Sequence, residues 1–250
     1  MFILETFQAG PRTAAPARNV VTKNQRLYKR VAYCLLLIAL HSRAVILPQR
    51  ACMSARAKQD RVDIESEVAV RTYAGNEPDT LIYLPGTHGD WTLIGSFRRA
   101  IAGRIPFAEI TYPRTLTWSL DDHAANIEAA LLRHGIKSGW LLGESFGSQV
   151  AWALARRSSF ETRGIILAGG FVRHPAPWAV RIVESVGKII PLAVITAILF
   201  GYAKIARLRF RKSPEVAAGI QEFIARRTEL DKKAAMHRLR LIFQNDPRQS

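Results

Sequence analysis

The sequence has few of the residues that build disulfide frameworks or thiolate metal sites. Only two of its 250 residues are cysteines, Cys34 and Cys52, and both lie near the N-terminus. The rest of the chain can therefore hold neither a disulfide nor a cysteine-ligated metal of its own. The chain is long enough to bury one good core, or a core with an added cap.

Long apolar runs are also absent. Val31–Leu40 is a run of ten residues, which is too short for a transmembrane helix. Ile189–Tyr202 is very apolar, but it is short and Pro191 interrupts it. We expect this second run to be a cap helix rather than a membrane span. The basic residues that follow it would suit an anionic surface, so peripheral membrane contact stays open as an alternative.

Acidic residues are scarce at both ends of the chain, which carries a formal net charge of +16. Residues 1–61 hold eleven Lys and Arg against two acids, and residues 202–250 hold twelve against five. Residues 62–201 are neutral, with thirteen of each sign. A nucleic-acid-binding protein should show its positive charge on the folded domain itself. The neutral middle of the chain therefore argues against nucleic acid as a partner.

Residues 1–60 are interpreted as a basic N-terminal extension, and three explanations for it stay open. Basic residues followed by an apolar stretch over residues 29–47 resemble an export or anchor signal, although no small-residue cleavage site follows. Alternatively, Met53 is the true start, and the protein is then cytoplasmic. The third explanation is a disordered basic arm. The localisation is unknown from the sequence.

The chain is organised around Ser138–Arg157, with the sequence SGWLLGESFGSQVAWALARR. An apolar run enters the pattern G-x-S-x-G, which continues into residues of helical character. Strand, sharp turn and helix in this order are typical of a nucleophile elbow with Ser145 at its tip. A side chain two residues before or after the serine would collide with the strand or the helix, which explains Gly143 and Gly147. The Phe146 amide, at the start of the helix, is expected to face a developing oxyanion.

A second glycine-rich stretch, PGTHGDW over residues 85–91, follows the apolar strand predicted at Thr80–Leu84. Open α/β sheets place ligands at the carboxyl ends of such strands. The backbone N–H of Thr87 is therefore expected to face the same oxyanion as the Phe146 amide.

Strands and helices alternate from about residue 66 to residue 172. The predicted strands cover residues 68–73, 80–84, 107–111, 140–142 and 164–170, and the predicted helices cover residues 93–101, 119–134 and the segment after Ser145. A helix start at Ser119 is indicated by Asp122 three residues later, in the pattern of a capping box. This alternation predicts an α/β fold, with right-handed βαβ units around a mostly parallel sheet and helices on both faces.

These residues resemble a known family. Residues 63–172 are similar to the N-terminal part of an α/β-hydrolase, through LIYLPGTHGDW and LLGESFGSQVAWALA at the separation that the family uses. The resemblance implies an α/β-hydrolase core with Ser145 as nucleophile and the Thr87 and Phe146 amides as oxyanion hole. It implies no metal and no organic cofactor. The residues expected to line the substrate pocket are Gly86, His88 and Glu144.

Residues 173–250 show no convincing strand. Helices are predicted at Trp178–Lys188 and Ile189–Tyr202, with one or two more over Pro214–Phe243. Family members often insert a helical cap at this position, so the resemblance implies a cap or lid that roofs the pocket. Its apolar character favours an apolar small-molecule substrate.

The residues that would complete a catalytic triad are missing from the pattern. In the hydrolase order the acid and then the histidine follow the serine. His174 is expected at the surface, and His237 lies about 120° around a helix from Asp231, so the two are not a pair. We therefore expect a hydrolase core that is C-terminally incomplete, and no base is assigned.

Three functions remain open at this stage. The first is hydrolysis of an ester or related acyl bond by a serine hydrolase. The others are a non-catalytic binding protein of the same fold and a protein of the membrane surface.

Overall fold

The structure is a computed structural model that describes residues 4–7, 67–209 and 214–245, with side chains over 67–205 and 218–245. All of these residues belong to one unit, Met1–Ala9 together with Lys58–Ser250. Apart from Leu4–Phe7, the N-terminal extension lies outside the described part of the chain. The three explanations for it therefore stay predictions.

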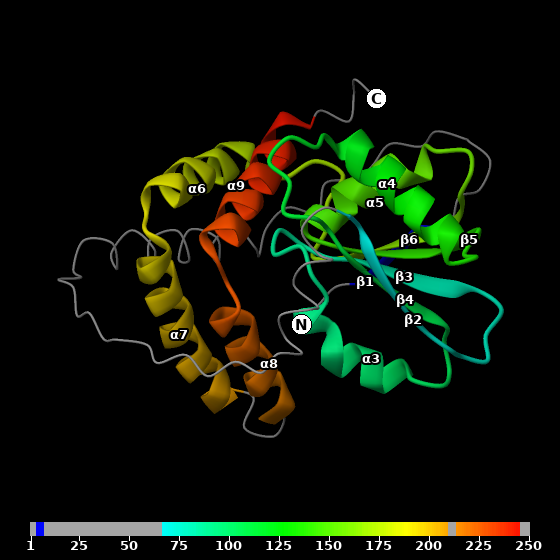
Figure 1. The fold of residues 1–250 in the computed structure, drawn as a ribbon, viewed down its shortest axis with the longest axis horizontal. Helices are drawn as coiled ribbons and strands as arrows, with labels where there is room; N and C mark the ends of the chain where they lie inside the picture. The colour runs from blue at the N-terminus through cyan, green and yellow to red at the C-terminus, as the bar shows by residue number, and fades with distance from the viewer. Residues whose placement is uncertain (1–3, 8–66, 210–213, 246–250) are drawn as a thin grey trace. The chain divides into compact units, whose positions relative to one another are not determined.

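A six-stranded sheet forms the centre of this unit, with the order β1-β6-β5-β3-β4-β2 (Figure 1). The strands are β1 (Leu4–Phe7), β2 (Ala69–Tyr73), β3 (Thr80–Leu84), β4 (Phe107–Thr111), β5 (Ser138–Glu144) and β6 (Glu161–Ala168). The four inner strands are parallel, whereas β2 and β1 are antiparallel to their neighbours at the two edges. The prediction of a mostly parallel sheet is confirmed.

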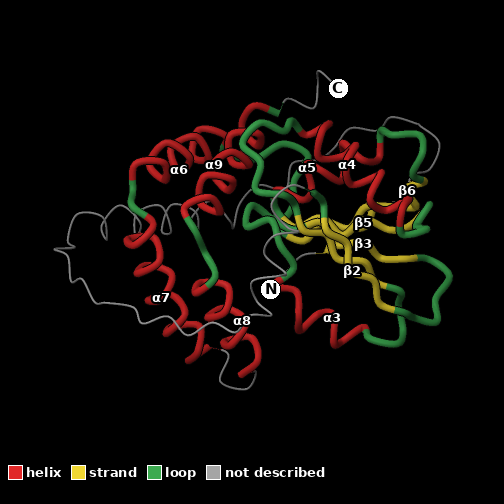
Figure 2. The backbone as a smooth tube through the Cα atoms, in the orientation of Figure 1, coloured by secondary structure: helices red, strands yellow, loops and turns green. Residues whose placement is uncertain are grey.

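Helices cover both faces of the sheet (Figures 1 and 2). Helices α4 (Leu120–Arg133) and α5 (Phe146–Ala155) lie on one face, and η1 (Thr92–Ile94) with α3 (Gly95–Ile101) lies on the other. Strand β3 shows why helices must cover both faces of the sheet. Its Ile82 belongs to the core beneath α4 and α5, and the adjacent Tyr83 belongs to the core beneath α3. A strand buried on both sides is apolar throughout, as the sequence TLIYL is.

Helix α4 begins at the capping box that the sequence predicts. The Ser119 hydroxyl accepts from the Asp122 amide at 3.1 Å, and the Asp122 carboxylate accepts from the Ser119 amide at 2.8 Å. The helix stops at Arg133, just before Gly135, which takes a φ of 75° that few other residues adopt easily. Because these signals are local, both ends of this helix could be predicted from a few residues.

Four helices follow β6 in the described ranges. They are α6 (Pro177–Ile189), α7 (Leu192–Arg209), α8 (Pro214–Ala225) and α9 (Glu229–Gln244). No strand follows β6 in the part of the chain that is described. Among the same residues no single helix is long and apolar enough to cross a membrane, although α6 and α7 together pass that test as a pair bent by 119°.

The edge of β6 is paired with a segment from the start of the chain. Residues Leu4–Phe7 form β1, with Leu4 opposite Ala168 and Phe7 opposite Ile165. Sequence analysis assigned these four residues to the N-terminal extension. In the structure they hydrogen-bond to an edge strand that would otherwise expose its N–H and C=O groups.

The buried carboxylate of Glu128 ties α4 to the loop between α5 and β6. It accepts hydrogen bonds from the Ser159 and Phe160 amides, each at 3.1 Å, and pairs with Arg157. Glu128→Ala is expected to lower the free energy of unfolding by about 2–4 kcal/mol, because two amides and a guanidinium lose their acceptor. Urea denaturation measures this change.

The exposed pair of Glu161 and Arg163 gives the matched control. Glu161→Ala should change stability by less than about 1 kcal/mol. Equal effects of the two substitutions would show that the Glu128 contacts do not stabilise the fold.

Candidate active site

Ser145 lies between the end of β5 and the start of α5, at a turn with unusual backbone angles. Its φ is 48° and its ψ is −112°. It is the one residue other than glycine with a positive φ in the described part of the chain. Such a conformation is costly for a residue with a side chain and is found mainly at functional sites. The strand, turn and helix predicted around Ser145 are therefore present, and the backbone of the turn is strained at the serine.

Two glycines make this turn possible. A Cβ atom on Gly143 would lie 2.8 Å from the Cα of Ser148 in α5. A Cβ on Gly147 would collide with β3, 2.7 Å from the carbonyl carbon of Leu84. The predicted steric need for glycine on both sides of the serine is thus confirmed, against the helix in one case and a strand in the other.

The Phe146 amide occupies the first position of α5, where an N–H group has no acceptor within its own helix. The partial positive charge of the helix N-terminus favours an anion there. The Phe146 ring is completely buried and packs edge-on against the rings of Tyr112 and His123. This packing anchors the beginning of α5 beneath the serine.

The loop after β3 lies beside this turn. The Gly89 amide donates to the Gly86 carbonyl at 3.0 Å, which closes a turn around Thr87 and His88. A Cβ on Gly86 would lie 3.3 Å from the Nδ1 of His88 and 3.5 Å from the Glu144 carbonyl oxygen. The three residues predicted to line the pocket, Gly86, His88 and Glu144, are therefore neighbours. The assignment of the Thr87 and Phe146 amides to an oxyanion hole stays a prediction.

The side chain of Glu144 does not point freely into a pocket. Its carboxylate accepts a hydrogen bond from the Tyr83 hydroxyl, and Tyr83 is buried. Burial, with the nearby charge of Glu144, raises the pKa of Tyr83. The phenol therefore remains a donor at neutral pH and holds the side chain that precedes the serine.

Arg238 of α9 binds the loop after β3. The sequence alone did not indicate this residue. Its guanidinium donates to the Thr87 carbonyl at 3.0 Å and to the Pro113 carbonyl at 2.9 Å, and only 2% of the residue is exposed. A Cβ on Gly89 would lie 2.6 Å from its Cζ atom. Burial lowers the pKa of Arg238 to about 10, so the side chain stays charged at neutral pH.

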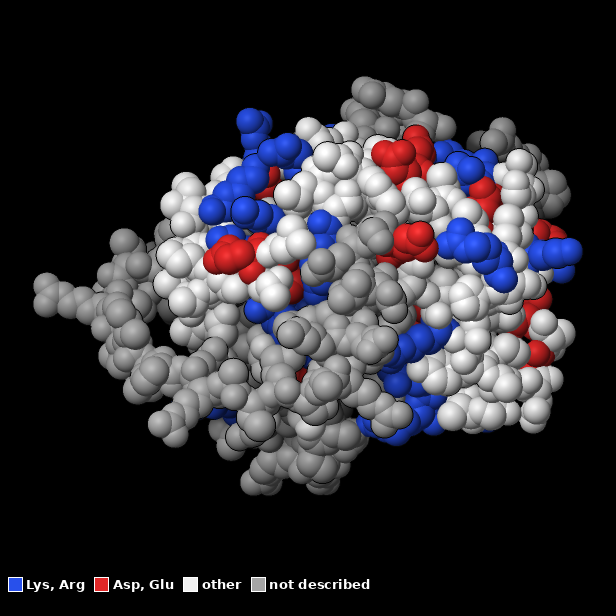
Figure 3. Space-filling model, viewed as in Figure 1, with Lys and Arg blue, Asp and Glu red and all other residues white. Residues whose placement is uncertain are grey.

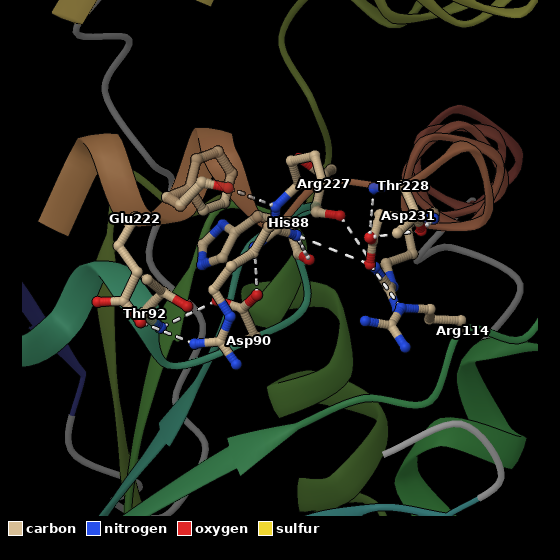
Figure 4. A network of polar contacts seen from close by, with 12 residues as sticks. His88, Asp90, Thr92, Arg114, Glu222, Arg227, Thr228 and Asp231 are labelled. Atoms are coloured by element: carbon tan, nitrogen blue, oxygen red, sulfur yellow. Dashed lines mark hydrogen bonds and ion pairs between the residues drawn. The ribbon is translucent and has the colours of Figure 1, made fainter. Parts of the chain in front are cut away.

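A network of ion pairs surrounds the same loop (Figure 4). Arg227 pairs with Asp90, donates to the His88 carbonyl at 3.3 Å and lies over the ring of Phe223. Burial alone would raise the pKa of Asp90, but the charges of Arg227 and His88, together with hydrogen bonds from the Thr92 amide and Arg227, outweigh it and the pKa is lowered. The carboxylate of Asp90 therefore stays ionised and fixes the end of the loop to the segment between α8 and α9.

A second ion pair joins the segment after β4 to α9. Arg114 pairs with Asp231 at 2.6 Å, and Asp231 also caps the start of α9 through Thr228 (Figure 4). Burial would raise the pKa of Asp231, and the contacts with Arg114 and Thr228 lower it below its usual value. The loops at the carboxyl ends of β3 and β4 are thus both attached to the C-terminal helices.

Known proteins with a similar structure identify the fold of this chain. No protein-family model matches the chain, and no curated protein matches it. Solved structures do match the chain. A hydrolase from Pseudomonas aeruginosa aligns with a TM-score of 0.56 at 14% identity, covering 73% of this chain and 71% of that one. An esterase from Exiguobacterium antarcticum aligns with a TM-score of 0.55 at 12% identity, covering 73% and 71%.

An enol-lactonase from Burkholderia xenovorans aligns equally well, with a TM-score of 0.55 at 14% identity over 73% of this chain and 72% of that one. A protein from Desulfitobacterium hafniense described as a putative α/β hydrolase aligns with a TM-score of 0.51 at 15% identity, covering 71% and 73%. The chain has the α/β-hydrolase fold. At these identities the likeness concerns the fold alone.

Within this α/β-hydrolase fold, no histidine of the described residues hydrogen-bonds to the Ser145 hydroxyl. His237 contacts the Trp118 carbonyl at 2.9 Å, and His174 accepts from the Ala176 amide at 3.1 Å. Asp231 is engaged by Arg114, so it does not pair with His237, as expected. His174 is half-buried against Phe171 rather than fully at the surface.

His88 is the histidine beside the elbow. Burial lowers its pKa, and the nearby carboxylates of Glu144 and Asp90 offset part of this effect. Its Nε2 atom is buried without a hydrogen-bond partner in the described structure, and its ring meets Phe223 edge-on. His88 is therefore a neutral ring on the loop that faces the serine turn.

The described residues also contain a cavity of about 290 Å³ between α6, α9 and the loop before α4. None of Gly86, His88, Glu144 or Ser145 lines it. No group of three or more His, Cys, Asp or Glu side chains suited to a metal ion occurs within the described ranges.

Arg238→Met should loosen the loop after β3, because the Thr87 and Pro113 carbonyls both lose a charged donor. We expect the free energy of unfolding to fall by about 2 kcal/mol in urea denaturation. Lys233→Met, at an exposed position of the same helix, should cost less than about 1 kcal/mol. If the two variants were equally stable, Arg238 would not hold this loop.

Stability should depend on pH through His123, whose ring is fully buried between Tyr112 and Trp118. Burial lowers its pKa from 6.5 to about 3, and the charges of Arg238 and His237 act in the same direction. The unfolded chain therefore binds a proton that the folded chain does not. The stability linked to this group is present above about pH 6.5 and is lost as the pH falls toward 3.

His123→Phe is therefore expected to reduce the loss of unfolding free energy between about pH 7.5 and about pH 5. Urea denaturation at the two pH values measures it, with His134→Phe, at an exposed site, as the control. An unchanged pH dependence in His123→Phe would mean that His123 has the same pKa in the folded and the unfolded protein.

Proposed function

We propose that the chain is a serine hydrolase that acts on an ester or related acyl bond of an apolar small molecule, with Ser145 as nucleophile. The observation that supports this most strongly is the backbone of Ser145, with its φ of 48° at the junction of β5 and α5. Strain of this kind persists where the surrounding structure enforces it and the function uses it. An ordinary strand-to-helix turn has no need of it.

The reaction would proceed in two steps. The Ser145 oxygen attacks the carbonyl carbon, its proton passes to a base and then to the leaving alcohol, and an acyl-enzyme forms. Water then attacks the acyl carbon, releases the acid and returns the proton to Ser145. In both steps the negative charge on the carbonyl oxygen would be stabilised by the Thr87 and Phe146 amides.

The fixed loop supports the assignment of Thr87. An oxyanion donor works when it is held in place before the charge develops. The hydrogen bond from Arg238 to the Thr87 carbonyl, the Gly86–Gly89 turn and the Arg227–Asp90 pair all restrict this loop. The esterase and the enol-lactonase among the structural neighbours act, by their names, on ester-type bonds, which is consistent with the proposed chemistry.

A second function is favoured by one observation. Because no histidine of the described residues contacts the Ser145 hydroxyl, a non-catalytic binding protein with the α/β-hydrolase fold fits the same geometry. An unactivated serine reacts poorly with acyl or phosphonyl groups, so reactivity of Ser145 separates the two functions.

The test is labelling of the full chain with a serine-reactive fluorophosphonate. We expect one adduct, on Ser145, that Ser145→Ala abolishes and Ser96→Ala, at an exposed serine of α3, retains. Labelling that persists in Ser145→Ala would refute the nucleophile. A chain that folds but takes no label at all would select the binding protein.

A further inference from the structure

Helix α6 carries its apolar residues on the face turned away from the rest of the unit. Trp178, Ile182, Val186 and Ile189 follow one another at intervals of four, four and three residues, so they form one stripe along the helix. All four are exposed, Trp178 to 66% and Ile189 to 82%. A surface helix of a globular protein normally turns such a stripe toward the core.

The opposite face of α6 is the one that packs. Val180, Glu184 and Gly187 are buried there, and Gly187 lies against Met236 of α9. The exposed stripe therefore cannot be buried against α9 by a small rotation without exposing these residues. The orientation of the helix is fixed with its apolar stripe outward.

Helix α7 also exposes apolar side chains after the bend of 119° that separates it from α6. Tyr202 and Ile205, three positions apart, are exposed on one side of α7, and Phe200 is exposed on another side. Neither helix alone is long and apolar enough to cross a bilayer. A pair of bent apolar helices of this kind can instead lie in the plane of a membrane interface.

Among the described side chains of α6 and α7, the exposed charged ones are all basic. Glu184 is their one acidic residue, and it is buried and paired with Lys188 and Arg240. Arg181 and Lys204 are exposed beside the apolar residues. Figure 3 shows Lys and Arg side chains gathered over the region of α6 and α9. The exposed surface is thus apolar with a mainly basic border, in which the exposed Glu229 accepts a hydrogen bond from the Leu192 amide at the start of α7.

We propose that α6 and α7 form a docking surface for a bilayer that contains anionic phospholipid. The apolar stripe would enter the boundary of headgroups and acyl chains, with Trp178 and Tyr202 at the depth that aromatic residues prefer. The basic border complements the lipid charge. The same charge disfavours a second copy of this surface, and it disfavours residues 1–61, which hold eleven Lys and Arg against two acids.

The test is co-sedimentation of the full chain with sucrose-loaded vesicles of phosphatidylcholine, with and without phosphatidylserine. We expect binding that needs phosphatidylserine and weakens in high salt. Ile182→Asn combined with Ile189→Asn should lower the partition coefficient about tenfold or more, because both side chains leave water on binding. Leu93→Asn combined with Leu116→Asn, at exposed apolar positions outside α6 and α7, should bind as the unmodified chain does.

Trp178 gives a second readout. Its fluorescence should be quenched by brominated lipid in the vesicles, and Trp178→Phe should remove that quenching. Three outcomes would overturn the proposal: no vesicle binding, binding that is equal in the double isoleucine variant, or self-association that this variant abolishes. The proposal is independent of the proposed catalytic function, since Ser145→Ala is expected to bind vesicles unchanged.

Discussion

The close approach of α5 to β3 is the constraint on which the rest of the site depends. Gly147 lies so near the Leu84 carbonyl that no side chain fits between the helix and the strand. The helix must therefore start directly after β5, and Ser145 takes the strained conformation that joins them. The parallel pairing of β3 with β5 fixes the distance between these elements. The same close contacts thus hold the sheet, the helix and the serine together.

The second feature is the attachment of the loop after β3 to the C-terminal helices. Arg238 and Arg227 reach this loop from α9 and from the segment before it, and they bind carbonyls and Asp90 rather than one another. A buried guanidinium has a high desolvation cost unless its donors are used. Hydrogen bonds to the Thr87 and Pro113 carbonyls offset part of this desolvation cost for Arg238. The same hydrogen bonds restrain the shape of the loop.

Local patterns could be predicted from the sequence, and long-range contacts could not. The strands, the capping box at Ser119 and the glycines around Ser145 depend on neighbouring residues, so each had a signal. Arg238 contacts Thr87 across 151 positions, and Tyr83 contacts Glu144 across 61. A single arginine in a basic helix carries no signal of such a partner. The same limit applies to any base for Ser145, which only its position in space could reveal.

The proposed function requires that Ser145 be held as a nucleophile beside two backbone donors. A crystal structure of the chain after reaction with an alkyl phosphonate would measure this directly. We expect a phosphonyl group on the Ser145 oxygen, a positive φ at that residue, and a phosphonyl oxygen within hydrogen-bonding distance of the Thr87 and Phe146 amides. An adduct on another residue, or an extended backbone at Ser145 with both amides directed elsewhere, would contradict it.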